Sequence, residues 1–260
     1  SGESLDTLMA MRHAAACGLR TIGLVNVASS TIAREADAVL PTRAGPEIGV
    51  ASTKAFTAQL TVLLCFAVAL ARAKGQIDEA RAEAIHAEIQ ALPALVGKAL
   101  GLFDAIRPVA HQLSQAKSAL YLGRGALYPL AMEGALKLKE LSYIHAEGFA
   151  SGEMKHGPIA LIEEDLPVVA LLAADAVMAK ASSNLREASA RGGKIILLSE
   201  ARAAAEVDYA SAVITVPDVD PLLAPILLAI PAQILAYLTA VEKGTDVDQP
   251  RNLAKSVTVE

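Results

Sequence analysis

The stretch GKIILLSE (193–200) decides the fold, because it has the composition of a strand that is buried on both faces. It is short, rich in isoleucine and leucine, and preceded by a second glycine, Gly192. Continuous hydrophobic strands of this kind are typical of parallel sheets that helices cover on both sides. A stretch of the same character, RTIGLVNV (20–27), begins 173 positions earlier.

The segments around these two stretches repeat in the same order. ADAVLPT (36–42) is a short strand that ends near a proline, and SAVITVP (211–217) is its counterpart. The chain is therefore predicted to contain two α/β units of one design. Helices are expected at corresponding places in both copies: 5–18 and 51–73 in the first, 175–193 and 221–242 in the second.

The second copy is the more complete one. It begins with a strand, SALYLGRG (118–125), that runs into a Gly-Arg-Gly turn, followed by a helix at 126–143 and a strand at 167–173. The first copy has nothing before Ser1 to match them. The repeat offset therefore predicts that the first domain is N-terminally truncated by roughly 55 residues or more.

These observations predict an α/β protein with two tandem domains, each a parallel sheet flanked by helices. The C-terminal part of the first domain is expected at 1–75. The range 76–243 should hold linking helices and the second domain, and 244–260 should be a tail. Apolar residues at helical spacing predict two linking helices over 76–114, with a break near Pro93.

Composition narrows the class of protein. Of 260 residues, 53% are hydrophobic and 20% charged, which excludes a disordered chain. A net charge of −5 without long basic runs argues against nucleic acid or acidic membranes as partners. The spacing of Cys17 and Cys65 fits neither a disulfide framework nor a metal site, so both are predicted to be core residues of a reduced, cytoplasmic protein. The sequence begins with no secretory leader pattern.

One apolar stretch tests the prediction that no membrane is involved. Residues 221–241 are long enough to span a bilayer. They contain Pro221, Pro225 and Pro231, however, and no Lys/Arg bias sets an orientation. A buried helix of the α/β core is therefore predicted.

Three segments carry candidate functional residues. The first is Ser1-Gly2-Glu3-Ser4, immediately before a helix. The N–H groups and dipole at a helix N-terminus favour an anion there, and Ser1 and Ser4 add hydroxyl donors, so a phosphate monoester is the natural ligand. Plain N-capping by serine is the alternative.

The second segment places acid and base on one helical face. Glu133, Lys137 and Glu140 lie at i, i+4 and i+7, on a helix apolar enough to be largely buried. A lysine held between carboxylates can position one of them as a proton-transfer base. A solvated ion-pair stripe is the alternative. The following HAEGFASGEMKHG (145–157) is expected to be a loop that carries polar function, and no spacing there suggests a metal.

The third segment is the Gly/Pro-containing turn at 45–54, which leads into the long apolar helix. Ser52 or Thr53 could cap that helix. The turn should also lie at the edge of the first sheet, so contact with a ligand is the other possibility.

These segments resemble the sugar isomerase (SIS) family of phosphosugar-binding domains. The strings that carry the resemblance are SGESLDTL (1–8), EIGVASTKAFT (47–57), residues 122–161 and the tail GTDVDQPRNLAKSVTVE (244–260). They are spread along the whole chain. The resemblance implies tandem SIS domains with a fructose-6-phosphate site in the first.

The resemblance assigns substrate-binding residues. Ser1 and Ser4 match the serines that bind the phosphate, and Val50 and Ser52 match positions that line the sugar. Ala254 offers its backbone.

The resemblance also assigns catalytic residues. Glu140 matches the carboxylate that moves a proton between C1 and C2, and Lys137 matches the lysine beside it. His156 matches the residue assigned to ring opening, which reaches in from a neighbouring subunit, and Lys255 matches the tail lysine that meets the ketose carbonyl. No cofactor or metal is implied.

The implied activity is isomerisation of fructose-6-phosphate, through its imine, to glucosamine-6-phosphate. The implied partners are these sugar phosphates, a second copy in a homodimer, and a glutaminase domain in the full-length protein, which nothing in this sequence resembles. Two alternatives stay open: a stand-alone SIS-type glucosamine-6-phosphate deaminase, and a non-catalytic phosphosugar sensor.

Overall fold

The computed structural model describes residues 1–255, which divide into two compact units. Unit 1 comprises Ser1–Ala82 together with the chain from Asp248 onward, and unit 2 comprises Glu83–Val247. Each unit is built on its own parallel sheet, as the sequence repeat predicts.

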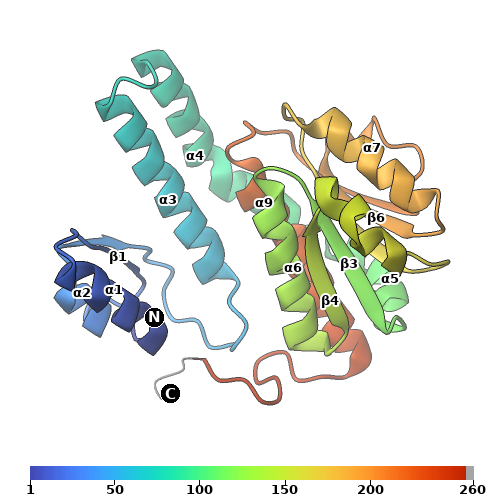
Figure 1. The fold of residues 1–260 in the computed structure, drawn as a ribbon, viewed down its shortest axis with the longest axis horizontal. Coiled ribbons are helices and arrows are strands. Elements are labelled where there is room, and N and C mark those ends of the chain that lie inside the picture. Colours follow the sequence, from blue (N-terminus) through green and yellow to red (C-terminus); the bar gives the residue numbers. More distant parts are fainter. Residues whose placement is uncertain (256–260) are drawn as a thin grey trace. The chain divides into compact units, whose positions relative to one another are not determined.

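Unit 2 contains a five-stranded sheet in which every pair of neighbouring strands is parallel. The strand order is β4-β3-β5-β6-β7. Strands β4, β3 and β6 of this sheet are labelled in Figure 1. The strands predicted near 118–125, 167–173, 193–200 and 211–217 are all confirmed. The bounds are β3 Ser118–Gly123, β4 His145–Ala150, β5 Pro167–Leu172, β6 Lys194–Glu200 and β7 Ala212–Val216.

Helices cover both faces of this sheet. One face packs against α6 (Leu127–Ser142) and α9 (Ala224–Lys243), with α5 (Phe103–Ser114) against α9. The other face packs against α7 (Met178–Ser189) and α8 (Ala201–Ala204). Alternate residues of the inner strands point to each face, so both sides of β3, β5 and β6 are buried.

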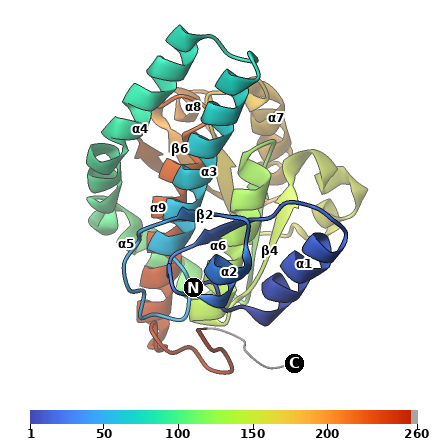
Figure 2. The same ribbon diagram turned by 90° about the vertical axis from the view of Figure 1, so that its left-hand side faces the viewer.

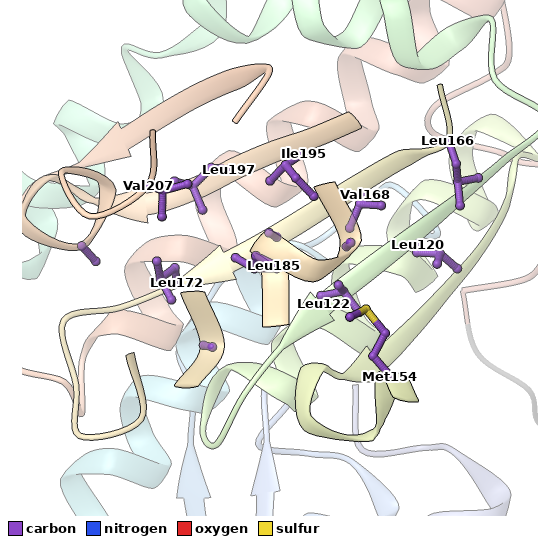
Figure 3. Packing of buried hydrophobic residues seen from close by; sticks show 14 residues of the cluster. Leu120, Leu122, Met154, Leu166, Val168, Leu172, Leu185, Ile195, Leu197 and Val207 are labelled. Atoms are coloured by element: carbon purple, nitrogen blue, oxygen red, sulfur yellow. The ribbon is translucent and has the colours of Figure 1, made fainter. Parts of the chain in front are cut away.

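Figure 3 shows the core on the α7 side of the sheet. Val168 and Leu172 of β5 and Ile195 of β6 pack around Leu185 of α7, all at 2% exposure or less. Met154, which follows β4, closes the same cluster. This continuous apolar packing is the reason that strands of this composition form the centre of the sheet.

The apolar helix predicted near 221–242 is α9, and it is buried within unit 2. It lies against α5 and α6, and 78% of its most apolar window is inside the protein. The prediction of a core helix is confirmed. One other described helix, α3 (Lys54–Ala73), is also long and apolar enough to cross a membrane by length and composition, but none of its side chains is buried.

Unit 1 has a small core built around two parallel strands. Strands β1 (Ile22–Val25) and β2 (Ala38–Pro41) pair in register, with Leu24 opposite Leu40. Helices α1 (Leu5–Ala16) and α2 (Thr31–Glu35), labelled in Figure 2, supply Leu8 and Ile32, which pack with Val25. The prediction of a fully buried first strand is wrong, because Ile22 is 51% exposed.

The segment predicted as a polar loop begins with a strand. His145–Ala150 forms β4, which pairs with β3 along its whole length, and the 3₁₀ helices η1 (Ser151–His156) and η2 (Pro158–Leu161) follow it. The prediction failed because β4 is an edge strand with half-exposed side chains. Its pairing rests on backbone hydrogen bonds, which do not require an apolar sequence. Gly148 is needed there, because a Cβ would lie 2.6 Å from the backbone of Met132.

The linking helices end at a different residue from the one expected. The helix α4 (Glu79–Leu100) runs through Pro93, and the break to α5 comes at Gly101 and Leu102, with a bend of 57°. A proline removes one backbone hydrogen bond from a helix without always ending it. Glycine has more backbone freedom than other residues, so the helical conformation is less favoured at Gly101.

The prediction of two core cysteines is wrong. Both are free and exposed. Cys17 is the residue after the last turn of α1, and Cys65 lies on α3, where no side chain is buried.

Tyr121 of β3 gives a test of the packing in unit 2. Its ring fits against α6 only because residue 134 is glycine: a Cβ there would lie 2.7 Å from Cε1 of Tyr121. The hydroxyl is buried and has no hydrogen-bond partner among the described residues, and burial raises its pKa.

An unsatisfied buried hydroxyl costs free energy, so Tyr121→Phe should raise the free energy of unfolding by about 1 kcal/mol. Urea denaturation measures this, and a clear loss of stability would contradict it.

Candidate functional site

Helix α6 positions a buried lysine between two carboxylates. Lys137 is 3% exposed, and its Nζ lies 2.5 Å from Oε2 of Glu140 and 3.6 Å from Oε1 of Glu133. Helix α6 packs against β3 and α9 through its apolar residues. Because of this packing, the face that bears Glu133, Lys137 and Glu140 is partly buried as well. The three residues predicted to share one face are therefore in contact, and they do not form a solvated stripe.

The pKa of Glu133 is raised above its ordinary value. Burial is the largest cause, the positive charge of Lys137 opposes it, and the negative charge of Glu140 adds to it. Lys137 makes its closer contact with Glu140. The arrangement thus holds one well-defined carboxylate, that of Glu140, against an ammonium group. The close contact with Lys137 fixes the position of the Glu140 carboxylate.

The two histidines of the following segment lie at the surface of unit 2. The side chain of His156 is 74% exposed, and its Nδ1 lies 2.7 Å from Oε2 of Glu153 within η1. His145 begins β4 and lies 3.6 Å from Glu147. Within residues 1–255, no hydrogen bond or ion pair joins His156 to Lys137 or Glu140.

In unit 1, Ser1 and Ser4 flank the start of α1. Ser4 is the N-cap residue, yet its side chain makes no capping hydrogen bond. The turn is held instead by the carboxylate of Glu3, which accepts a hydrogen bond of 2.8 Å from the N–H of Thr31. Gly2 has a φ of +99°, and a Cβ there would collide with Ser30. The alternative of plain capping by the Ser4 side chain is therefore not met, and binding of an anion by Ser1 and Ser4 stays a prediction.

The turn before α3 is organised by Glu47, a residue that the sequence analysis did not single out. Its Oε1 accepts hydrogen bonds from the N–H groups of Thr53 (2.9 Å) and Ala55 (3.2 Å) at the start of α3. The side chain of Thr53 makes no capping bond, so the prediction that Ser52 or Thr53 caps this helix is not met. Glu47 caps it from outside the helix.

The other carboxylate oxygen of Glu47 holds the predicted tail lysine. Lys255 Nζ lies 2.6 Å from Oε2 of Glu47 and donates a second hydrogen bond of 2.8 Å to the carbonyl oxygen of Gly49. The N–H of Val50 donates to the carbonyl oxygen of Asp248, 2.9 Å away. Unit 1 therefore brings Val50 and Lys255 together around one short turn.

Burial alone would raise the pKa of Glu47. The hydrogen bond from Lys255 and those from the N–H groups of Thr53 and Ala55 outweigh burial and lower it from 4.5 to about 2. Only 9% of the Glu47 side chain is exposed. A buried carboxylate that stays ionised at neutral pH is a fixed negative charge beside Lys255.

No local pattern in the sequence identifies Glu47. It precedes the first helical residue by seven positions, beyond the reach of a capping box, and its lysine partner lies 208 residues away. The weak signal was the placement of an acidic residue in a Gly/Pro turn that leads into an apolar helix without an acidic first turn.

A parallel sheet with this strand order and helices on both faces is a doubly wound α/β fold. The sequence model of the SIS domain matches residues 1–69 and 112–243. The chain therefore belongs to the SIS domain family.

Named relatives narrow the comparison. The chain is 56% identical over 261 residues to the glutamine–fructose-6-phosphate aminotransferase [isomerizing] of Zymomonas mobilis and 55% identical to that of Brucella abortus. Each match covers 100% of this chain and 43% of the relative, so the chain spans less than half the length of these relatives. The C-terminal domain of glucosamine-fructose-6-phosphate aminotransferase from Francisella tularensis matches in structure, with a TM-score of 0.92 and 42% identity, covering 96% of this chain and 71% of that one.

The pKa of Glu47 predicts a pH dependence of stability. Because the folded-state value is depressed, the charged carboxylate stabilises the fold above pH 4.5, and this stabilisation is lost as the pH falls from about 4.5 to about 2. Glu47→Gln removes the charge, so the variant should be less stable than the parent at pH 7, and the difference should shrink as the pH falls through this range. Urea denaturation across pH 7 to pH 2.5 measures it, at roughly half-unit steps.

Glu206→Gln is the matched control, because Glu206 is exposed and belongs to unit 2. It should leave stability and its pH dependence unchanged. A Glu47→Gln difference that stays constant down to pH 2.5 would show that the ion pair with Lys255 does not stabilise the fold.

Proposed function

We propose that this chain is the isomerase portion of a glucosamine-6-phosphate synthase, which converts fructose-6-phosphate, through its imine, to glucosamine-6-phosphate. The observation that carries the proposal is the buried contact of Lys137 with Glu140 on α6. Relatives at 55–56% identity across the whole chain are named as aminotransferases of this substrate, which supports it. A non-catalytic sensor has no need of such a carboxylate–lysine pair.

Substrate binding is assigned to unit 1. Ser1 and Ser4 bind the phosphate with their hydroxyls at the N-terminus of α1, where the helix dipole favours an anion. Val50, Ser52 and the backbone of Ala254 line the sugar. Binding energy from the phosphate, remote from C1 and C2, positions the reacting carbons.

Proton transfer is assigned to Glu140. A ketose becomes an aldose when one base removes a proton from C1 and returns it to C2, and a single carboxylate can serve both carbons. Lys137 holds that carboxylate in place and stabilises negative charge that develops on the neighbouring oxygen. His156 assists opening of the sugar ring by proton transfer.

Lys255 is assigned to the ketose carbonyl. Glucosamine-6-phosphate keeps a nitrogen that comes from ammonia, so an imine at Lys255 must be exchanged with ammonia, which releases the lysine, before the proton moves from C1 to C2. The Lys255 nitrogen can add to the C2 carbonyl carbon and, with loss of water, form that first imine. To do so, the amine must leave Glu47 and the Gly49 carbonyl and lose a proton. The ion pair with Glu47 therefore holds Lys255 beside the turn that contains Val50 and Ser52 until the amine reacts.

The wider setting belongs to the same proposal. The chain works in the cytoplasm as part of a homodimer, in which His156 acts across the subunit interface. A glutaminase domain in the full-length protein supplies ammonia. The domain boundaries at 75 and 243 stay predictions.

Replacement of Glu140 tests the assigned base. Glu140→Gln keeps the shape and a hydrogen-bond acceptor for Lys137 but cannot take a proton. Isomerisation should fall by about 10³-fold, within the range for loss of a general base, while fructose-6-phosphate binds as before. Proton NMR in D₂O follows turnover to the aldose phosphate and solvent exchange at C1, and calorimetry measures binding.

The control variant is again Glu206→Gln, which should retain full turnover. Unchanged turnover in Glu140→Gln would refute the assigned base. Loss of binding together with turnover would mean that Glu140 contributes to the substrate site rather than to proton transfer.

Chemical trapping tests the role of Lys255. If its nitrogen forms an imine with fructose-6-phosphate, borohydride adds hydride to the C=N bond and leaves a stable secondary amine. Mass spectrometry of the digested protein should find the adduct on Lys255. Lys255→Arg, which keeps the positive charge, should show no adduct. If the parent chain also shows no adduct on Lys255, an imine at this residue is excluded.

A further inference from the structure

Unit 2 contains a cavity that the proposed isomerisation does not use. Its volume is about 420 Å³, and it is open to solvent at the protein surface, where Lys155, Lys180 and Ser183 of its lining are exposed. The residues that define its chemistry come from three elements: Arg124 after β3, Lys155 in η1, and Lys180, Ser183, Asn184 and Glu187 in α7.

The topology of the sheet places this cavity where ligands bind in doubly wound folds. The chain leaves β3 through α6 toward β4 on one side, and the next strand, β5, pairs with β3 on the other side. Connections therefore diverge at the carboxyl ends of β3 and β5. Arg124 follows the end of β3, and α7 is the helix that follows β5. In sheets of this strand order, ligands bind at this point of divergence.

Arg124, the cationic residue that directly follows strand β3, is held in place by a hydrogen bond. Nη1 of Arg124 donates to Oδ1 of Asn184 at 2.9 Å, and the hydroxyl of Ser151, which is buried, lies 3.4 Å from the same oxygen. Residue 152 is glycine, and a Cβ there would lie 2.7 Å from Nη1 of Arg124. The guanidinium is thus fixed before any ligand arrives, which lowers the entropic cost of binding.

The cavity carries a net positive charge. Lys155 pairs with Glu187 at 2.9 Å, whereas Lys180 has no ion-pair partner among the residues that the structure describes. Three cations and one carboxylate leave a charge of +2. Guanidinium and ammonium groups that line one cavity can bind a phosphate dianion, which offers oxygens to several donors.

The internal repeat shows that this is not a second copy of the serine site. At the repeat offset of 173, Ser1 to Ser4 correspond to 174–177, where the sequence is Ala-Asp-Ala-Val and contains no hydroxyl. The Asp175 carboxylate accepts a hydrogen bond from the N–H of Val177 at 2.9 Å. An anion in unit 2 would therefore be bound by cationic side chains and not by serines.

We propose that the cavity formed by Arg124, Lys155, Lys180, Ser183, Asn184 and Glu187 binds a small phosphate ester. The site is separate from the residues assigned to isomerisation, and the proposal does not depend on that assignment.

Calorimetric titration with glycerol 3-phosphate tests the proposal. The chain would carry Ser1→Ala and Ser4→Ala, which removes the hydroxyls of the proposed phosphate site in unit 1. We expect saturable binding with one site, and Lys180→Gln in this background should weaken it about tenfold. Lys180 is exposed at the surface of α7, so the fold should tolerate the change, and thermal melting checks this.

The control variant is Lys194→Gln, which removes one positive charge at the amino end of β6, where Lys194 pairs with Asp165 at 2.7 Å. It should leave the affinity unchanged. Glycerate, a monocarboxylate of similar size, should bind at least tenfold more weakly than glycerol 3-phosphate. Equal losses in Lys180→Gln and Lys194→Gln, equal affinity for glycerate, or no saturation by millimolar glycerol 3-phosphate would each overturn the proposal.

Discussion

Burial of the Lys137 ammonium group is the constraint on which helix α6 and its candidate base depend. A buried charge without a partner costs several kcal/mol, so a lysine that is 3% exposed requires an anion in contact. Glu140 supplies the close contact and Glu133 the distant one. Because α6 is packed against β3, β4 and α9, the helix cannot rotate to release the lysine to water. The pair that makes burial possible also fixes the carboxylate of Glu140.

The parts of the fold that the sequence predicts are those in which local composition and burial agree. Strands β5 and β6 are continuous apolar runs because both of their faces are covered, and such runs are recognisable without a structure. Strand β4 was missed because it lies at the sheet edge, where half-exposed positions accept histidine, glutamate and glycine. A sequence pattern reports burial, and an edge strand is held by backbone hydrogen bonds.

Some residues of the candidate site could be predicted from the sequence and others could not, for the same physical reason. Spacing along α6 was enough to place Glu133, Lys137 and Glu140 on one face, because a helix fixes its own neighbours. Glu47 could not be found by this reasoning, because its role depends on amides at the start of α3 and on a tail lysine distant in sequence. One carboxylate thereby joins the helix start, the turn and the tail of unit 1.

The two copies of the α/β design differ in the loops at the ends of their strands, besides the number of strands in their sheets. The core of unit 2 constrains the residues inside β3, β5 and β6, since each must fill space between two layers of helices. The segments that follow the strands carry no such constraint, so serines stand before α1 where alanine, aspartate and valine stand before α7. Duplication of a fold therefore does not duplicate its ligand chemistry. Each set of loops must be interpreted from its own side chains.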